Sequence, residues 1–434
     1  MDTWSEQKRR RFYRVCLNIF NKKPDRGVSL LIKNGFVGTN PKELAHFFLT
    51  RRGLSRTKIG EFLGTMGSKY HEDVLESYVS YIDFADMEID VALRNLLEYF
   101  ALPGEAQKIE KILFVFSKTY VNCNGKNSQF ITDADDAHIL SFAIIMLNTD
   151  LHTPNLKASK RMKVEDFVKN ITAIDNLSTI CPNYLRRLYN RIKQEEFQPA
   201  RDHVTQVVDV DKSVIGKDKP KLVEPYRRLI CYCRLQQVNC ISKKQNAGAH
   251  LREIFLFNDL ILIVKILNRK KDEPQYTLRY WASLNDIKIE GFESQYYKHG
   301  IMINDSNGQQ TILNARTNSD KIRFVNDVRE SILECNEMER VRIEMELTKQ
   351  NNTTGNTGNN LGFEIANFSL NTDRQRDSGL SDSSALNSVS SICPSTSSSS
   401  GVRAPGTAPP IRRLSFNSLD SGMAEEACEL SIEH

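Results

Sequence analysis

The spacing of the apolar residues changes once along this chain, near residue 226, and this change limits the fold more than any other feature. Before it, apolar side chains recur every three or four residues, which places them on one face of an α-helix. After it, short β-branched and aromatic runs such as REIFLF, residues 252–257, alternate with loops rich in Asn, Gly and Lys. The pattern therefore predicts an all-α domain followed by a β domain.

Composition predicts where the domains begin and end. We expect a helical domain over residues 5–200, a polar linker over 201–220, and a small β-barrel with a C-terminal helix over 221–349. The closing helix is predicted from Ser319 to Lys349, where apolar residues again recur at helical spacing. The remainder, 350–434, is rich in Ser, Thr and Asn. It offers too little apolar surface to offset the entropy of ordering, so we expect a disordered tail.

Several classes of protein are disfavoured. The net charge of +5 over 434 residues gives no argument for nucleic acid. No apolar run reaches the ~18 residues that a membrane span needs, and the basic start lacks the apolar core of a secretory signal. The nine cysteines form no CxxC pair, which is typical of a reducing cytosolic interior. The histidines form no ligand-like cluster and no GxxxxGK[ST] occurs, so we expect no metal, no cofactor and no P-loop nucleotide site.

The stretch ALPGEAQKIEK, residues 101–111, places an acid at a corner between two helical patterns. Pro103 and Gly104 are expected to end the first helix, and Glu105 stands where the next one begins. Acids are common at helix N-termini because they complement the helix dipole. From this stretch alone, a helix cap is therefore the ordinary interpretation of Glu105.

Two motifs resemble a known family. LPGEAQKIEKILFVF and, about thirty residues on, DAHILSFAIIMLNTDLHTPNLK resemble the two signatures of the Sec-seven domain, the exchange-factor module for Arf GTPases. The resemblance runs from about Lys8 to Phe197. HLREIFLFNDLILIVKIL, with the strand-then-helix pattern, resembles a pleckstrin-homology (PH) domain. The tandem is similar to the IQ-motif-and-Sec-seven group of brefeldin-resistant Arf exchange factors.

The resemblance implies a guanine-nucleotide exchange factor that performs no covalent chemistry. It implies that Glu105 is a glutamic finger that expels GDP and magnesium from an Arf GTPase, the plasma-membrane Arf being the expected partner. It also implies a groove that binds the GTPase and includes Asp135, His138, Phe142, Ile145, Met146, Asn148 and Thr153. Many Sec-seven domains carry Asn where this chain has Thr153, so one polar contact is expected to differ.

The PH resemblance implies binding to phosphoinositides through basic side chains. The candidates are Arg234, Lys243, Lys244, Arg252, Lys265, Arg269, Lys270 and Lys271. Each basic group near an anionic leaflet contributes roughly 1 kcal/mol, so several converging could hold the protein on a membrane. We therefore expect a cytoplasmic protein, peripheral at the plasma membrane or endosomes, in the context of endocytosis, actin remodelling and membrane trafficking.

Alternatives remain open. The same fold could serve as a lipid-tethered scaffold whose exchange activity is lost or incidental. A nucleic-acid binder would use the basic runs KRRR and NRKK, but no aromatic residues interleave with them. No IQxxxRGxxxR pattern occurs, so calmodulin is not an expected partner of this chain. In the tail, RRLS places basic residues before Ser415, which makes it a candidate phosphorylation site.

Overall fold

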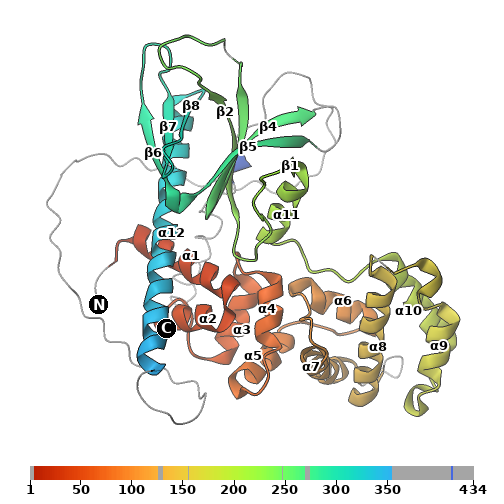
Figure 1. Cartoon of the computed structure of the whole chain (residues 1–434). Coiled ribbons are helices and arrows are strands. Elements are labelled where there is room, and N and C mark those ends of the chain that lie inside the picture. The colour runs from red at the N-terminus through yellow and green to blue at the C-terminus, as the bar shows by residue number, and fades with distance from the viewer. Residues whose placement is uncertain are drawn as a thin grey trace, which may run out of the picture. The chain divides into compact units, whose positions relative to one another are not determined.

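The computed structural model describes residues 4–125, 131–154, 156–246, 248–268, 274–353 and 412–413. The predicted helical domain is confirmed. Its α-helices are α1 (Glu6–Lys22), α2 (Pro24–Lys33), α3 (Pro41–Thr50), α4 (Arg56–Leu63), α5 (Lys69–Ser80), α6 (Ile89–Tyr99), α7 (Ala106–Asn124), α8 (Ala134–His152), α9 (Val164–Thr172) and α10 (Pro182–Gln194). Two 3-10 helices, η1 (Ala158–Lys160) and η2 (Asp175–Leu177), flank α9. Figure 1 shows α6, α7 and α8 as neighbours within this domain.

Local sequence signals set several of the helix starts. The Asn40 side chain accepts a hydrogen bond from the backbone N–H of Lys42, and the Asp133 side chain accepts bonds from the first turn of α8. Such caps satisfy backbone donors that have no partner inside the helix. Pro24, Pro41 and Pro182 occupy the first turns of α2, α3 and α10, where a missing N–H costs nothing.

The segment 201–220, expected as a polar linker, contains regular structure. It forms α11 (His203–Ser213) and the short strand β1 (Val214–Ile215). Asp202 and Thr205 make a capping box at the start of α11. Val207, Val210 and Val214 are buried against the sheet, so a narrow apolar stripe in a polar segment folds it onto the β domain. The three valines indicated regular structure, but the polar composition of the segment around them suggested a linker.

The β domain is one sheet that curves back over itself. Its strands are β2 (Leu229–Gln237), β3 (Leu251–Phe257), β4 (Leu260–Asn268), β5 (Gln275–Ser283), β6 (Ile287–Phe292), β7 (Gly300–Asp305), β8 (Gln310–Asn314) and, from the tail, β9 (Arg412–Arg413). The strand order is β1-β5-β4-β3-β2-β8-β7-β6, with β9 on β2. The 3-10 helix η3 (Leu284–Asp286) joins β5 to β6. Because β2 meets β8 only at Gln236 and Gln237, it bends from one half of the sheet into the other.

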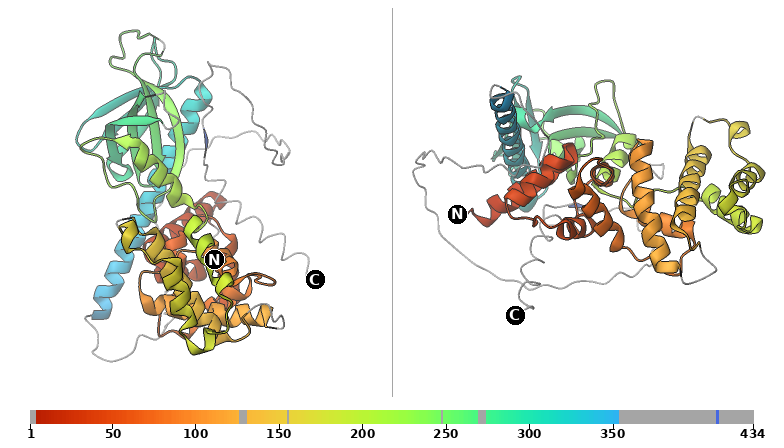
Figure 2. Two further views of the ribbon diagram at one scale, coloured as in Figure 1. Left: turned by 90° about the vertical axis from the view of Figure 1, so that its right-hand side faces the viewer. Right: turned by 90° about the horizontal axis from the view of Figure 1, so that it is seen from below.

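The C-terminal helix closes the β domain. It is α12 (Asn318–Thr353), which confirms the helix predicted from Ser319 to Lys349. Phe324, Val325 and Val328 are buried in one core with the inner face of the sheet, and Figure 2 shows the helix beside the strands. The predicted tail, 350–434, lies outside the described residues apart from 350–353 and 412–413, so its expected disorder stays a prediction.

Buried charges connect α1 to the β domain. Arg14 of α1 donates to Glu334 of α12 at 2.9 Å, and Arg228, just before β2, donates to the same carboxylate at 2.7 and 2.9 Å. Asn18 of α1 bonds both Glu334 and Arg228. Figure 2 shows α1 and α12 beside one another in its right-hand view. No part of this polar cluster was anticipated from the sequence.

Candidate functional site

The turn before α7 carries Glu105 at its outer end. Glu105 is the N-cap residue of α7, but its carboxylate makes no capping hydrogen bond within the part of the chain that is described. Its side chain is 71 % exposed and pairs with Lys108 of the next helical turn, with 2.9 Å between Oε1 and Nζ. The carboxylate therefore faces solvent, beside one partly buried lysine, rather than neutralising the helix start.

The Pro-Gly pair does not act as the sequence suggested. Helix α6 ends at Tyr99, and Phe100 already has an extended backbone, so the helix stops before Pro103. Gly104 does not have a positive φ, and a Cβ built on it would meet nothing within 4 Å. The turn therefore does not depend on a glycine at position 104, because no close approach or left-handed backbone requires one there.

Helix α4 holds the base of this turn. The Arg56 guanidinium donates to the Tyr99 carbonyl at the end of α6, and the Ala101 N–H donates to the Arg56 carbonyl at 3.1 Å. Gly60 lies directly against the turn, since a Cβ on it would come within 1.8 Å of the Ala101 carbonyl oxygen. A glycine within a helical pattern often marks such a close approach. This was the one signal in the sequence that could have revealed the brace.

The end of α4 supports the other side of the turn. A Cβ on Gly64 would lie 3.1 Å from Lys108 Cβ and 3.2 Å from Pro103 Cγ. Lys111 Nζ donates to the Thr65 carbonyl at 2.5 Å, and burial lowers the pKa of this lysine. The turn is thus packed on both sides, which limits the entropy that it loses when a partner docks.

An apolar stripe on α8 lies beside α7. His138, Phe142 and Met146 follow one another at intervals of four residues, so they share one face of the helix. Met146 is 41 % exposed, while the other two are partly buried. Phe114 of α7 is 43 % exposed and its ring meets the His138 ring edge-on, with centroids 6.0 Å apart. Large exposed apolar side chains grouped in this way are typical of interaction surfaces.

Phe114 was not among the contact residues expected from the sequence. The core-facing residues of α7 include Ile112, Leu113 and Phe116, and Phe114 lies between them in sequence but faces solvent. Only an odd aromatic residue outside the helical period indicated it.

Two predicted contact residues do not lie on this surface. Ile145 is 4 % exposed and belongs to the core, because its position on α8 is one step away from the exposed stripe. The Asn148 side-chain oxygen accepts a hydrogen bond from the Phe197 N–H at 3.0 Å, so it holds the end of the helical domain. Asp135, in the first turn of α8, and Thr153, its C-cap, are exposed.

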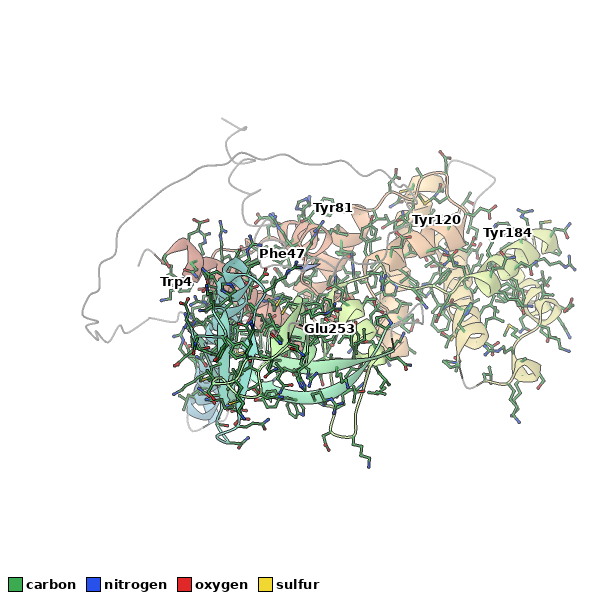
Figure 3. All side chains as sticks on the ribbon, turned by 90° about the horizontal axis from the view of Figure 1, so that it is seen from above. Trp4, Phe47, Tyr81, Tyr120, Tyr184 and Glu253 are labelled. Atoms are coloured by element: carbon green, nitrogen blue, oxygen red, sulfur yellow. The ribbon has the colours of Figure 1, made fainter. Side chains whose placement is uncertain are left out.

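The predicted lipid-binding residues divide into two groups. Lys243 and Lys244 are exposed between β2 and β3, and Lys265 is exposed on β4. Arg234 instead donates to Glu253 at 2.5 Å, a carboxylate that is buried in the sheet and labelled in Figure 3. Arg234 therefore neutralises an internal acid. Arg269, Lys270, Lys271 and the candidate phosphorylation site Ser415 lie outside the described residues.

Arg252 has a cationic neighbour that the sequence did not reveal. It lies on β3, partly buried, and Arg279 lies on β5. Burial and the charge of Arg279 together lower the pKa of Arg252. Two guanidinium groups that repel each other favour a bound anion, so Arg279 joins Lys243, Lys244 and Lys265 as a candidate contact to an acidic headgroup.

The described residues include no candidate membrane-spanning helix and no group of metal ligands. None of the helices there is both long and apolar enough to cross a bilayer. Nor do three or more His, Cys, Asp or Glu side chains converge there as metal ligands would.

This arrangement defines a class of protein: a helical domain that displays a carboxylate on a braced turn, followed by a curved β-sheet closed by a helix. Comparison with known families gives the particular family. Residues 9–197 match the Sec7 domain, and residues 218–350 match the PH domain of the family IQ_SEC7_PH. The chain is therefore a Sec7-domain protein that also carries a PH domain.

Two relatives each match less than half of this chain. The chain is 39 % identical over 219 residues to brefeldin A-inhibited guanine nucleotide-exchange protein 2 of Arabidopsis thaliana, covering 46 % of this chain and 12 % of that protein. It is 39 % identical over 176 residues to brefeldin A-inhibited guanine nucleotide-exchange protein 1 of Homo sapiens, covering 41 % and 9 %. It thus spans only a small part of the length of these relatives.

Among solved structures, the chain is similar to the Sec7p catalytic domain. The identity is 36 %, over 42 % of this chain and 96 % of that one, with a TM-score of 0.38.

Proposed function

We propose that this protein is a guanine-nucleotide exchange factor for Arf-family GTPases. The single observation that carries the proposal is the exposed Glu105 carboxylate on a turn braced by α4. The Sec7 domain and two relatives named as guanine nucleotide-exchange proteins, each 39 % identical, support it. The protein itself breaks and forms no covalent bond. It stabilises the nucleotide-free GTPase, and GTP from the medium then refills the site.

Electrostatics explains how one carboxylate could release a nucleotide. A GTPase holds its nucleotide through the phosphates, a P-loop lysine and magnesium. A carboxylate inserted there repels the β-phosphate and offers the lysine a substitute partner. Two unit charges about 4 Å apart interact by roughly 4 kcal/mol at an effective dielectric of about 20. Applied to the barrier for release, this energy corresponds to about a thousandfold in rate.

The apolar stripe supplies the binding surface in this proposal. His138, Phe142 and Met146, with Phe114, would contact the GTPase segments that move during exchange, and Asp135 and Thr153 would lie at the edge. A flexible Met side chain suits a partner whose surface changes shape. The stripe and the turn belong to α7, α8 and the segment before α7, so one docked molecule could reach both.

The PH domain would bring the exchange factor to membranes. Lys243, Lys244, Lys265, Arg252 and Arg279 would contact phosphoinositide headgroups. Attachment of both proteins to one membrane would raise their effective concentration. By resemblance, the expected partner is the plasma-membrane Arf, in endocytic and actin-linked trafficking.

Release of labelled GDP from an Arf protein tests the central step. Glu105→Lys should reduce the stimulated release rate by about a thousandfold or to the uncatalysed rate, while thermal unfolding stays unchanged. Glu76→Lys, which makes the same charge change on the exposed face of α5, is the matched control and should retain activity. Equally slow release by wild type and Glu105→Lys would instead favour a lipid-tethered scaffold.

Vesicles test the membrane part separately. Binding and exchange should both increase on vesicles containing phosphatidylinositol bisphosphate compared with neutral vesicles. Equal binding to the two vesicle types would remove phosphoinositide recruitment from the proposal, and it would leave the action of Glu105 untouched.

A further inference from the structure

A cavity of about 730 Å³ has neither Glu105 nor the exposed loop lysines of the β domain in its wall, although Arg56, which bonds the base of the Glu105 turn, does line it. Its wall comes from the segment between α3 and α4, the start of α11 and the start of β2. It contains five arginines, namely Arg51, Arg52, Arg56, Arg201 and Arg228, and two aspartates, Asp202 and Asp209. Neither the helical domain nor the β domain forms this cavity by itself, and the sequence placed none of these residues together.

The two aspartates in the wall are already engaged. One Asp202 oxygen accepts bonds from the Val204 and Thr205 N–H groups, and the other accepts from the Arg56 N–H at 3.1 Å. Asp209 pairs with Arg201 at 2.6 Å, at an exposed position. One acid therefore caps a helix, the other forms a surface ion pair, and the wall contains five guanidinium groups and two carboxylates, with Glu334 pairing Arg228 from outside the wall.

Two buried groups of the wall have unused hydrogen-bonding capacity. Arg228 is 6 % exposed, and its terminal nitrogens bond Asn18 and Glu334. Its Nε–H is buried without a hydrogen-bond partner among the described residues. His203 donates from Nε2 to the Pro225 carbonyl at 2.7 Å, which leaves Nδ1 as an acceptor, also buried without a partner there. A buried donor without a partner is costly and therefore needs an explanation.

We propose that this cavity binds a polyphosphate anion. Guanidinium groups match phosphate oxygens in pairs, which makes arginine the preferred side chain for multiply charged phosphates. Phosphate oxygens accept from the exposed guanidinium groups of Arg52 and Arg201, and the negative charge of the ligand stabilises the buried Arg228 cation in the same wall. The volume is within the range of small-molecule sites, about 300 to 1,000 Å³, and admits an inositol polyphosphate. A soluble inositol phosphate and a lipid headgroup offer the same chemistry.

Calorimetric titration of the full chain with inositol hexakisphosphate tests the site. Lys243 and Lys244 are first replaced by Gln in every protein compared, which removes the exposed lysines of the PH loop. We expect saturable binding in this background and a rise in Tm with ligand. Adding Arg52→Gln and Arg201→Gln, at two exposed positions of the wall, should weaken binding tenfold or more. Tripolyphosphate should bind at the same place, and more weakly.

The control removes the same charge elsewhere. Arg186→Gln with Arg187→Gln, exposed on α10 and not part of the wall, should leave the affinity unchanged. Equal weakening by both pairs would mean attraction to net charge alone and would overturn the proposal, as would the absence of saturable binding. Flotation with phosphatidylinositol bisphosphate vesicles identifies the source, because only a lipid headgroup would make flotation depend on Arg52 and Arg201. No GTPase is present, so the outcome is independent of the exchange proposal.

Discussion

Arg14 and Glu334, 320 residues apart in the chain, form a buried ion pair with 2.9 Å between Nε and Oε2. The Arg14 side chain is 2 % exposed and that of Glu334 is 0 % exposed. Arg228 and Asn18 bond the same carboxylate, so its charge is matched and hydrogen-bonded on several sides. Such a cluster gives α1, β2 and α12 one specific fit, because any other arrangement would leave charges buried and unpaired.

Removing the central charge should destabilise the fold strongly. Glu334→Gln leaves the buried Arg228 without its carboxylate and Arg14 with Glu330 alone, so we expect a loss of about 3 to 5 kcal/mol in the free energy of unfolding. Chemical denaturation would measure it. Glu339→Gln on the same helix removes only a surface partner of Arg342 and should cost less than about 1 kcal/mol. Similar losses in both variants would contradict the role of the buried cluster.

The same carboxylate should make stability depend on pH. Burial alone would raise the pKa of Glu334, but the charges and hydrogen bonds of Arg228 and Arg14 outweigh it and lower the pKa below its ordinary 4.5. A lowered folded-state pKa stabilises the protein fully above the unfolded value, and that stability is lost as the pH falls through the folded value. The unfolding temperature Tm should therefore fall as the pH drops below about 4.5. Glu334→Gln should show a smaller change over this window.

The brace beneath Glu105 should be sensitive to one methyl group. Gly60→Ala places a Cβ 1.8 Å from the Ala101 carbonyl oxygen, so the turn or α4 must move. Overpacking of this kind costs about 1 to 3 kcal/mol. We expect a lower Tm and slower stimulated GDP release. Gly104→Ala is the comparison for stability, since its new Cβ has open space and its Tm should match wild type.

Substitutions at two apolar residues should distinguish an effect on GTPase binding from an effect on stability. Phe114→Ala removes an exposed ring, so stability should change by less than about 0.5 kcal/mol. If the ring contacts the GTPase as an interface anchor, KM for exchange should rise by about tenfold or more. Ile145→Ala empties a core position and should cost about 2 to 5 kcal/mol in stability. An unchanged KM in Phe114→Ala would remove α7 from the proposed contact surface.

Replacing basic residues of the β domain should have one of two effects, a loss of stability or a loss of vesicle binding. Arg234→Gln leaves the Glu253 carboxylate buried without its ion pair, so Tm should fall. Lys243→Glu with Lys244→Glu changes only exposed side chains and should lower vesicle binding without lowering Tm. Vesicle flotation and thermal unfolding, measured on both proteins, distinguish the two. A loss of Tm in the lysine variant would contradict its loop assignment.

Local signals were sufficient for most of the secondary structure. The three- and four-residue spacing in segment 89–100 predicted α6, and the β-branched and aromatic run in 252–257 predicted β3. The segment 201–220 shows where such signals fail. Its three buried valines were too few to stand out among polar neighbours, and their value depends on a sheet that forms elsewhere in the chain.

The candidate site was only partly predictable for a related reason. A helical period identifies an apolar stripe, but it does not say which edge of that stripe meets the core. Phe142 and Ile145 are three residues apart in one motif, yet the first is partly exposed and the second is buried. Phe114 was missed because its exposure depends on how α7 packs against its neighbours.

By itself the sequence determined the order of the two domains, the helix starts and the acid at position 105, because caps, periodicity and turn residues act over a few positions. Tertiary structure alone decided that α4 braces the turn, that Arg234 serves Glu253, and that Arg14, Arg228 and Glu334 meet. These outcomes depend on burial and on charges brought together from distant segments. Local spacing carries no information about either.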